Sequence, residues 1–186
     1  MRPQILISSF ITLLFLGLNL KALELGEPIM GGNGCISLGK AILSEGGVLK
    51  VPLGLRLVKQ KDTAFDRKTC NFRLPISLNA NEKLQILDAS QSVRILTKAG
   101  AQVKSTLNIS LVGHSTKDLS ISSGLPDKNT SAVEILKSEK GEILAETECG
   151  QSAMLAGNHN ILATGAARSF TSTGSARITL KIVSCE

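Results

Sequence analysis

The 186-residue chain carries 21 Lys and Arg against 15 Asp and Glu, which gives a formal net charge of +6, and it contains no Trp or Tyr. The basic residues are spread along the chain without a block of like charges, which argues against a nucleic-acid-binding tail and against a polybasic membrane patch. The scarcity of aromatic residues argues against modules that stack sugars or bases on flat rings.

The first residues have the pattern of a secretory signal peptide, assigned to 1–22. Arg2 precedes an almost uninterrupted apolar run from Ile5 to Leu20, the layout of a short basic region followed by an apolar one. We expect cleavage after Ala22, which leaves a mature chain without a membrane span, secreted or periplasmic. A retained membrane anchor is the alternative, since the run approaches the roughly 20 residues that span a bilayer.

Residues 23–34 follow as an irregular lead-in. Pro28, Gly31, Gly32 and Gly34 disfavour both a helix and a strand there. We therefore expect no residue of the mature chain before Cys35 to belong to the core. Residues 35–186 form the remaining unit, a single domain long enough to bury its own core.

Beyond Cys35, several stretches alternate apolar and polar residues, which is the period of a strand with one buried face. The positions of the apolar parity are Leu49, Val51, Leu53, Leu55 and Leu57; Cys70, Phe72, Leu74, Ile76 and Leu78; Val103, the polar Ser105, Leu107, Ile109 and Leu111; and Ala176, Ile178, Leu180 and Ile182. Shorter apolar segments at 84–87, 93–96, 133–136 and 143–145 are separated by turn signals. No stretch keeps a helical period, so the sequence predicts an all-β fold, an antiparallel β-sandwich of about eight to ten strands.

Two local features interrupt this alternation. Pro52 removes a donor from the ladder of its strand, which indicates an edge strand. The segment 163–176, rich in Gly, Ser, Thr and Ala, has a biased composition and predicts a long flexible hairpin or loop.

All four cysteines, Cys35, Cys70, Cys149 and Cys185, lie in the part of the chain that we expect to be exported. An even number of cysteines in an oxidising compartment predicts two disulfides, for which three pairings exist. The absence of a CxxC pair argues against a zinc site. Cys70 shares the buried parity of its strand, so we interpret it as a structural cysteine that bridges across the sheet interior.

Three short motifs resemble an uncharacterised secreted family, domain of unknown function 4360. They are GNGC at 32–35, RKTC at 67–70 before an alternating strand, and ECGQSAMLAGNHNI at 148–161. Members often carry Tyr and Trp in the middle region and Ser-Pro before the late Cys-Gly, where this chain has Thr147 and Glu148. The resemblance implies secretion, disulfides and a β fold but no activity. It also implies a nested pairing, Cys70 with Cys149 and Cys35 with Cys185.

Candidate catalytic groups are few. His114 with Asp118 and a serine would suit a hydrolase triad, but no G-x-S-x-G elbow accompanies them. His114 and His159 with Asp118 or Asp127 lack the spacing of a metal motif. The sequence thus assigns no catalytic residue, metal or cofactor. The acids available as a glycosidase pair also fit the solvated face of a hairpin; they are Glu134, Glu142, Glu146 and Glu148.

The mature chain keeps Phe65, Phe72 and Phe170, of which Phe72 has the buried parity. At most two phenylalanines are left for any surface. Two glycosylation sequons begin at Asn108 and Asn129, and they matter only in a eukaryote.

These observations favour an exported, non-catalytic β-sandwich that acts as an extracellular or envelope-associated binding or structural module. Its partner is unknown; a protein of the cell envelope or extracellular space fits, and nucleic acid does not. A secreted hydrolase with an unrecognised site and a disulfide-framed protease inhibitor are the alternatives.

Overall fold

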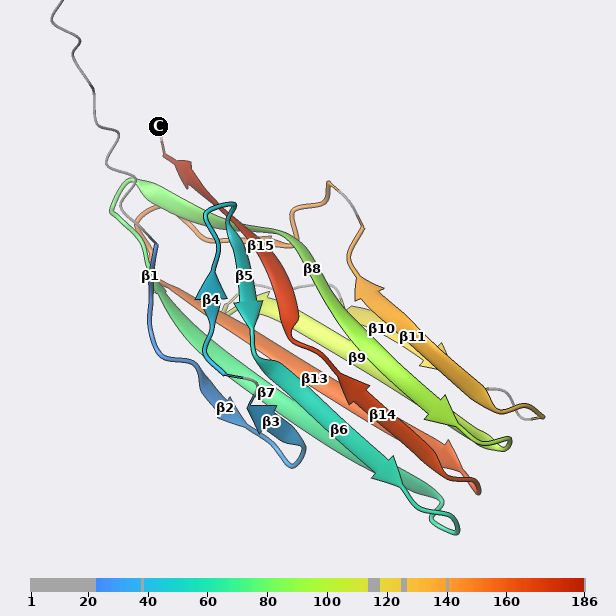
Figure 1. Cartoon of the computed structure of the whole chain (residues 1–186). Coiled ribbons are helices and arrows are strands. Elements are labelled where there is room, and N and C mark those ends of the chain that lie inside the picture. Colours follow the sequence, from blue (N-terminus) through green and yellow to red (C-terminus); the bar gives the residue numbers. More distant parts are fainter. Residues whose placement is uncertain (1–22, 38, 114–117, 125–126, 140, 186) are drawn as a thin grey trace, which may run out of the picture.

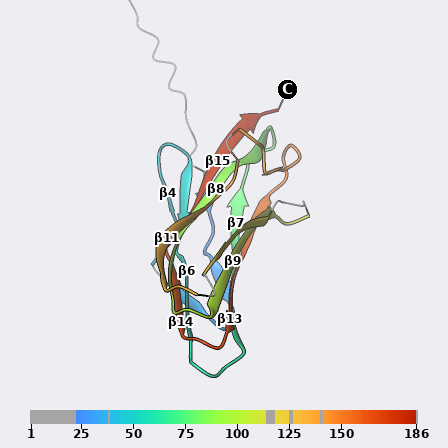
Figure 2. The ribbon, with the colours of Figure 1, turned by 90° about the vertical axis from the view of Figure 1, so that its right-hand side faces the viewer.

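The fold is described from a computed structural model, which covers residues 23–37, 39–113, 118–124, 127–139 and 141–185. The expected signal peptide lies outside these residues. Fifteen strands form two antiparallel sheets that pack face to face, and Figure 2 shows the two layers edge-on. The predicted all-β sandwich is confirmed. No helix of the described residues has the length and hydropathy that crossing a membrane requires.

The smaller sheet has six strands in the order β1-β7-β13-β9-β10, with β2 also paired to β7. Long neighbours form its centre, since β13 pairs along its length with both β7 and β9 (Figure 1). The strands are β1 (Glu24–Leu25), β2 (Ile29–Gly31), β7 (Phe65–Ser77), β9 (Ala101–Leu111), β10 (Asp118–Ser123) and β13 (Ala153–Gly165).

The larger sheet has nine strands and is organised around β8, which pairs with β14 and β15 on one side and with β11 and β12 on the other. The path continues from β14 to β6 and β3, and from β15 to β5 and β4. The strands are β3 (Cys35–Ser37), β4 (Ile42–Leu43), β5 (Val48–Val51), β6 (Leu53–Lys59), β8 (Glu82–Thr97), β11 (Thr130–Lys137), β12 (Ala145–Glu146), β14 (Ser169–Thr173) and β15 (Ala176–Ser184).

The core lies between the two sheets and consists of the alternating apolar positions. Every apolar position predicted in the stretches 49–57 and 103–111 is buried, and so are Cys70, Phe72, Leu74 and Ile76. In the last stretch, Ala176, Ile178 and Leu180 are buried while Ile182 is partly exposed near the strand end. The burial of apolar surface on this scale is the main force that holds the sheets together.

The number of strands exceeds the prediction because short strands form before Val48 (β1 to β4) and at β12, β14 lies in a predicted loop, and the run 49–57 is divided into β5 and β6. Pro52 lies between β5 and β6, at a break where no ladder donor is needed, so the edge-strand prediction is wrong. The predicted loop at 163–176 is also wrong. It contains the end of β13, all of β14 and the start of β15, because its small residues pair with β6 and β8.

The lead-in 23–34 forms two short strands, β1 and β2, so the expectation that Gly and Pro exclude a strand there is wrong. No described residue before Cys35 is among the buried core residues, as predicted, but the lead-in packs against that core. Glu24 and Leu25 pair with Ser77 and Ile76, and β2 pairs with β7. Leu25 and Met30 are partly buried and pack against the core. The Gly and Pro residues separate β1 from β2 but do not prevent either strand from forming.

Deleting residues 23–31 is therefore expected to lower the melting temperature by about 4 to 8 °C. Two partly buried apolar side chains contribute on the order of 2 kcal/mol, and each kcal/mol shifts Tm by about 2 to 4 °C in a domain of this size. Thermal unfolding followed by circular dichroism measures the change. Glu27→Ala, an exposed change in the same segment, is the control; an unchanged Tm for the deletion would contradict the packed arrangement.

The four cysteines form two disulfides, but the nested pairing is wrong. The bonds join Cys35 to Cys70 and Cys149 to Cys185. Gly34 donates its N–H to the Thr69 carbonyl, so the chain crosses between the sheets directly beside Cys70. Cys149 and Cys185 meet because Gly150 and Cys185 both hydrogen-bond the start of β8, at Glu82 and Asn81. As predicted, Cys70 links the two sheets. Cys185 lies one residue beyond β15.

Candidate functional site

The histidine candidates do not form a solvent-accessible catalytic site in the described part of the chain. His114 lies outside the described residues, so the structure says nothing of a triad with Asp118. His159, on β13, is completely buried in the core. Its Nε2 lies 2.8 Å from Ser105 Oγ, and its Nδ1 has no hydrogen-bond partner. A serine hydrolase needs an acid on that second nitrogen and a substrate path to the serine; the Ser105–His159 pair has neither.

Burial lowers the pKa of His159 from 6.5 to about 4. Between these pH values the unfolded chain binds a proton that the folded chain does not, so acid favours unfolding. The stabilisation is complete above pH 6.5 and is lost as the pH falls toward 4. The neutral ring thus serves as a core residue with one hydrogen bond.

We predict that the wild-type protein loses on the order of 3 kcal/mol of unfolding free energy through this residue as the pH falls from 6.5 to 4. To isolate the contribution of His159, the measurement is the difference between the wild type and His159→Leu in urea unfolding at each pH. The variant should show the shallower pH dependence. Parallel curves for the two proteins would show that His159 is not the titrating group.

The acidic candidates are dispersed. Glu146 forms an ion pair with Lys83 at 3.1 Å, and Glu148 accepts a hydrogen bond from Gln151. Asp118 accepts one from Asn108 on the neighbouring strand. Glu134 is on β11 and Glu142 is in the turn before β12. Within the described residues, no three His, Cys, Asp or Glu side chains gather where they would hold a metal ion.

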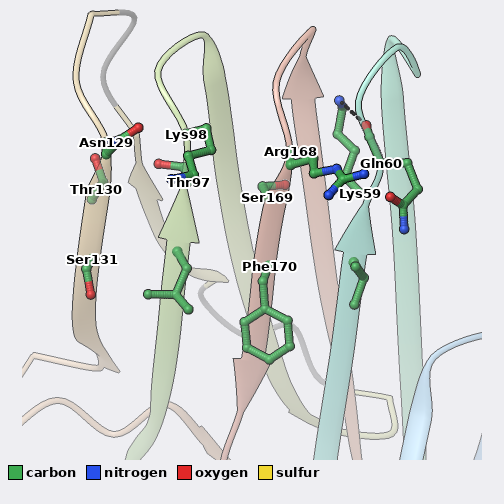
Figure 3. A pocket seen from close by; sticks show the side chains of 12 residues that line it. Lys59, Gln60, Thr97, Lys98, Asn129, Thr130, Ser131, Arg168, Ser169 and Phe170 are labelled. Carbon is green, nitrogen blue, oxygen red and sulfur yellow. Dashed lines mark hydrogen bonds between the residues drawn. The ribbon is translucent and has the colours of Figure 1, made fainter.

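A hollow of about 530 Å³ lies near one end of the larger sheet and is the strongest candidate site. Its walls come from β6, β8, β11 and β14, from the turns that follow β6 and β8, and from the residues that precede β11 and β14. Figure 3 shows Phe170 on the central strand, with Lys98 and Arg168 at the turns above it, Thr130 and Ser131 on β11, and Asn129 just before that strand.

Strand register sets the floor of this hollow. Phe170 faces Val58 on one side and Leu96 on the other, and Leu96 faces Ser131. Val58 is 45% exposed, and Phe170 and Leu96 are partly exposed. Val58, Phe170 and Leu96 therefore form a continuous apolar row across three strands, which we call the apolar row. An apolar floor with a polar rim is the usual composition of a ligand site.

Basic residues flank the apolar row. The Arg56 guanidinium carbon lies 5.3 Å from the centre of the Phe170 ring, a cation–π distance that holds both side chains against the sheet. Arg56 and Arg94 both face Ser172, so they stand on either side of β14, two residues from the apolar row. Both are exposed.

The buried Lys59 side chain holds one end of the hollow in place. This side chain is 1% exposed, and its ammonium group donates to the carbonyls of Gln60 and Ala167 at 3.1 and 3.0 Å. The bond to Ala167 ties β6 to the turn between β13 and β14, from which Arg168 projects (Figure 3). The wall of the hollow is thus held in place at the turn.

The outer face of the smaller sheet has a different chemistry. Asn71, Asn158 and Asn108 face one another across three strands and end at Asp118. The next row contains Thr69, Asn160 and Thr106. These rows of amides and hydroxyls, with Arg67 bonded to Asn160 and Asp118 bonded to Asn108, are the second candidate surface. It includes one of the predicted sequons, Asn108.

Sequence reasoning missed the hollow because it placed Phe170 in a loop. Phe170 and Ser172 alternate with the buried Ser169 and Thr171, a short strand period that the surrounding Gly and Ala residues obscured. Phe65, which is exposed at the start of β7, does not line this hollow.

No family model and no curated protein matches the chain. Among solved structures, it is similar to a carbohydrate-binding module, TmCBM61, in complex with β-1,4-galactotriose. The identity is 7%, the TM-score is 0.31, and the match covers 84% of this chain and 88% of that one. Similarity at this level identifies neither a shared ligand nor a shared site.

Proposed function

We propose that the protein is an exported, non-catalytic binding module that holds its ligand on the outer face of the larger sheet. The observation that carries this proposal is the hollow above the apolar row, with Phe170 at its centre and cations around it. The two disulfides support an oxidising, extracytoplasmic compartment. The signal peptide over 1–22 and membership of domain of unknown function 4360 stay predictions.

The side chains that line the hollow support binding rather than catalysis. The hollow is lined by side chains of Lys, Arg, Thr, Ser, Asn, Gln and apolar residues, and this lining supplies no carboxylate or imidazole for general acid or base catalysis. A hydrolase using His114, and an inhibitor that presents a loop near a disulfide, remain as alternatives from the sequence, with no structural observation that favours either.

Retention of the mature chain on immobilised extracellular polymers tests the proposal. A panel of neutral and acidic polysaccharides and envelope proteins is the probe, and we expect at least one to retain the wild type. Phe170→Thr keeps a strand-forming residue but removes the ring, so retention should fall about ten-fold, which corresponds to about 1.4 kcal/mol.

Phe65→Thr, which removes an exposed phenylalanine outside the hollow, is the matched control and should bind like the wild type. Equal binding by Phe170→Thr at an unchanged Tm would overturn the assigned face. Release of low-molecular-weight product from any polymer would overturn the non-catalytic reading.

A further inference from the structure

We infer that the ligand of this face is an acidic polysaccharide, a sugar polymer that carries carboxylate or sulfate groups. The inference rests on the proposed function and adds the chemical class of the ligand. It is carried by the charge of the outer face of the larger sheet, which extends well beyond the hollow.

Cations recur along the outer face at positions set by strand register. Lys50 faces Arg177, Arg177 faces Ser90, and Ser90 faces Lys137. Arg94 lies four residues further along β8. It faces Ser172 on β14, and Ser172 faces Arg56 on β6. We call these five exposed residues the basic face; they are Lys50, Arg56, Arg94, Lys137 and Arg177.

The outward positions that connect the basic face to the apolar row contain no acid. Between the two cationic rows stand Ser92 and Ile135, which face each other. The nearest acid along β8 is Asp88, two residues from Ser90, and its carboxylate accepts a hydrogen bond from Ser138. Glu134 belongs to the opposite parity of β11, between the exposed Val133 and Ile135. A surface with positive charge along its length attracts a negatively charged polymer over that whole length.

The spacing suits an extended polymer with repeated anionic groups. Neighbouring strands lie about 5 Å apart, so Lys50 and Arg177 stand side by side while Arg56 and Arg94, two strands apart, are separated by about 10 Å. The two cationic rows lie four residues apart along β8, roughly 13 Å. Ligand groups that neutralise both rows must therefore belong to a molecule longer than one sugar.

The residue types match a sugar acid. Arg56, Arg94 and Arg177 carry planar guanidinium groups that pair with carboxylate or sulfate through two parallel hydrogen bonds. The apolar row offers Phe170, Val58 and Leu96 to the C–H face of a sugar ring. Lys98 and Arg168, at the rim of the hollow (Figure 3), supply two further cations beside that ring.

Other polyanions fit less well. Insertion into an anionic bilayer needs apolar side chains that project beyond the charges. Outside the apolar row, which forms the floor of a hollow, the exposed apolar side chains beside the cations are Val133 and Ile135 on β11. The two disulfides support an oxidising, extracytoplasmic compartment, away from the nucleic acid of the cytoplasm. Stacking of bases also needs several exposed aromatic rings, and this face has Phe170 alone among its described residues.

Binding of the mature chain to polygalacturonate and to heparin, measured by titration calorimetry at two salt concentrations, tests the inference. We expect Arg56→Gln/Arg94→Gln to weaken binding roughly ten-fold at low salt and to reduce the salt dependence, because fewer counterions are released. Arg73→Gln/Lys104→Gln removes the same charge from exposed positions on the other sheet and should leave the affinity within about two-fold of the wild type.

The outcomes separate the inference from the proposed function. Binding of neutral dextran or galactan that depends on Phe170 but not on the arginine pair would overturn the acidic ligand while keeping the binding face. Equal weakening by both double variants would show attraction by net charge alone and overturn the site. Duplex DNA or anionic lipid vesicles that bind more tightly than either polysaccharide would overturn the assignment to a polysaccharide. Retention of no polymer at all would overturn the proposed function itself.

Discussion

Replacing Cys35 and Cys70 together by alanine is expected to lower the free energy of unfolding by about 3 to 4 kcal/mol. The bond closes a loop across 35 residues and joins β3 of the larger sheet to β7 of the smaller one. Without it, the unfolded chain gains conformational freedom while the packed core stays nearly the same. Cys70 is fully buried, so alanine is the suitable replacement there.

Urea unfolding at neutral pH measures this change. Cys149→Ala/Cys185→Ala is the matched comparison, since its bond spans 36 residues and the chain-entropy model gives nearly the same loss. Peptide mapping of the unreduced wild type should show the Cys35–Cys70 and Cys149–Cys185 peptides. A peptide that joins Cys70 to Cys149 would contradict the pairing, and a loss below about 1 kcal/mol would contradict the constraint on the unfolded chain.

A second large effect is expected at Gly157, where even alanine should cost about 3 kcal/mol. Gly157 faces Phe72 across β13 and β7. A Cβ at Gly157 would lie 2.1 Å from Cε1 of Phe72 and 2.9 Å from its Cδ1 and Cζ. The ring is 1% exposed, so it has no space into which it can move.

A double-mutant cycle with Phe72→Leu tests the cause. The smaller leucine should relieve the clash, so that Gly157→Ala costs at least about 1 kcal/mol less in the Phe72→Leu background. Gly31→Ala, in strand β2 with no atom within 4 Å of the added carbon, is the control and should be nearly neutral. If Gly157→Ala is as stable as the wild type, the close packing of β13 on Phe72 is wrong.

The sheet core could be predicted from the sequence because burial follows a period of two. Burial alternates without interruption from Val103 to Leu111, and from Leu49 to Leu57 it does so except at Pro52 and Gly54, which are buried too. The polar Ser105 keeps its inward place beside His159. The segment 163–176 could not be predicted, since Gly, Ala, Ser and Thr give little apolar contrast. Its strands are fixed by pairing with β6 and β8, which is long-range information.

The disulfide pairing and the candidate site depend on the same long-range pairing. Cys35 reaches Cys70 only because β2 runs along β7 before the chain crosses to β3. Val58, Phe170 and Leu96 come from three distant segments, and only the register of β6, β14 and β8 brings them into one row. The sequence indicates that each residue is an outward or irregular position, but it does not predict that the three lie side by side.

The most direct test of the binding face is a titration of the mature protein with polygalacturonate oligomers, followed by backbone amide chemical shifts. We predict that the largest changes map to the apolar row and the basic face, at Val58, Arg94, Leu96 and Phe170. In Arg56→Gln/Arg94→Gln the changes in the apolar row should need about ten times more ligand. Changes centred instead on Asn71, Asn108 and Asn158 of the smaller sheet would contradict the account, because they would place the ligand on the opposite side of the sandwich.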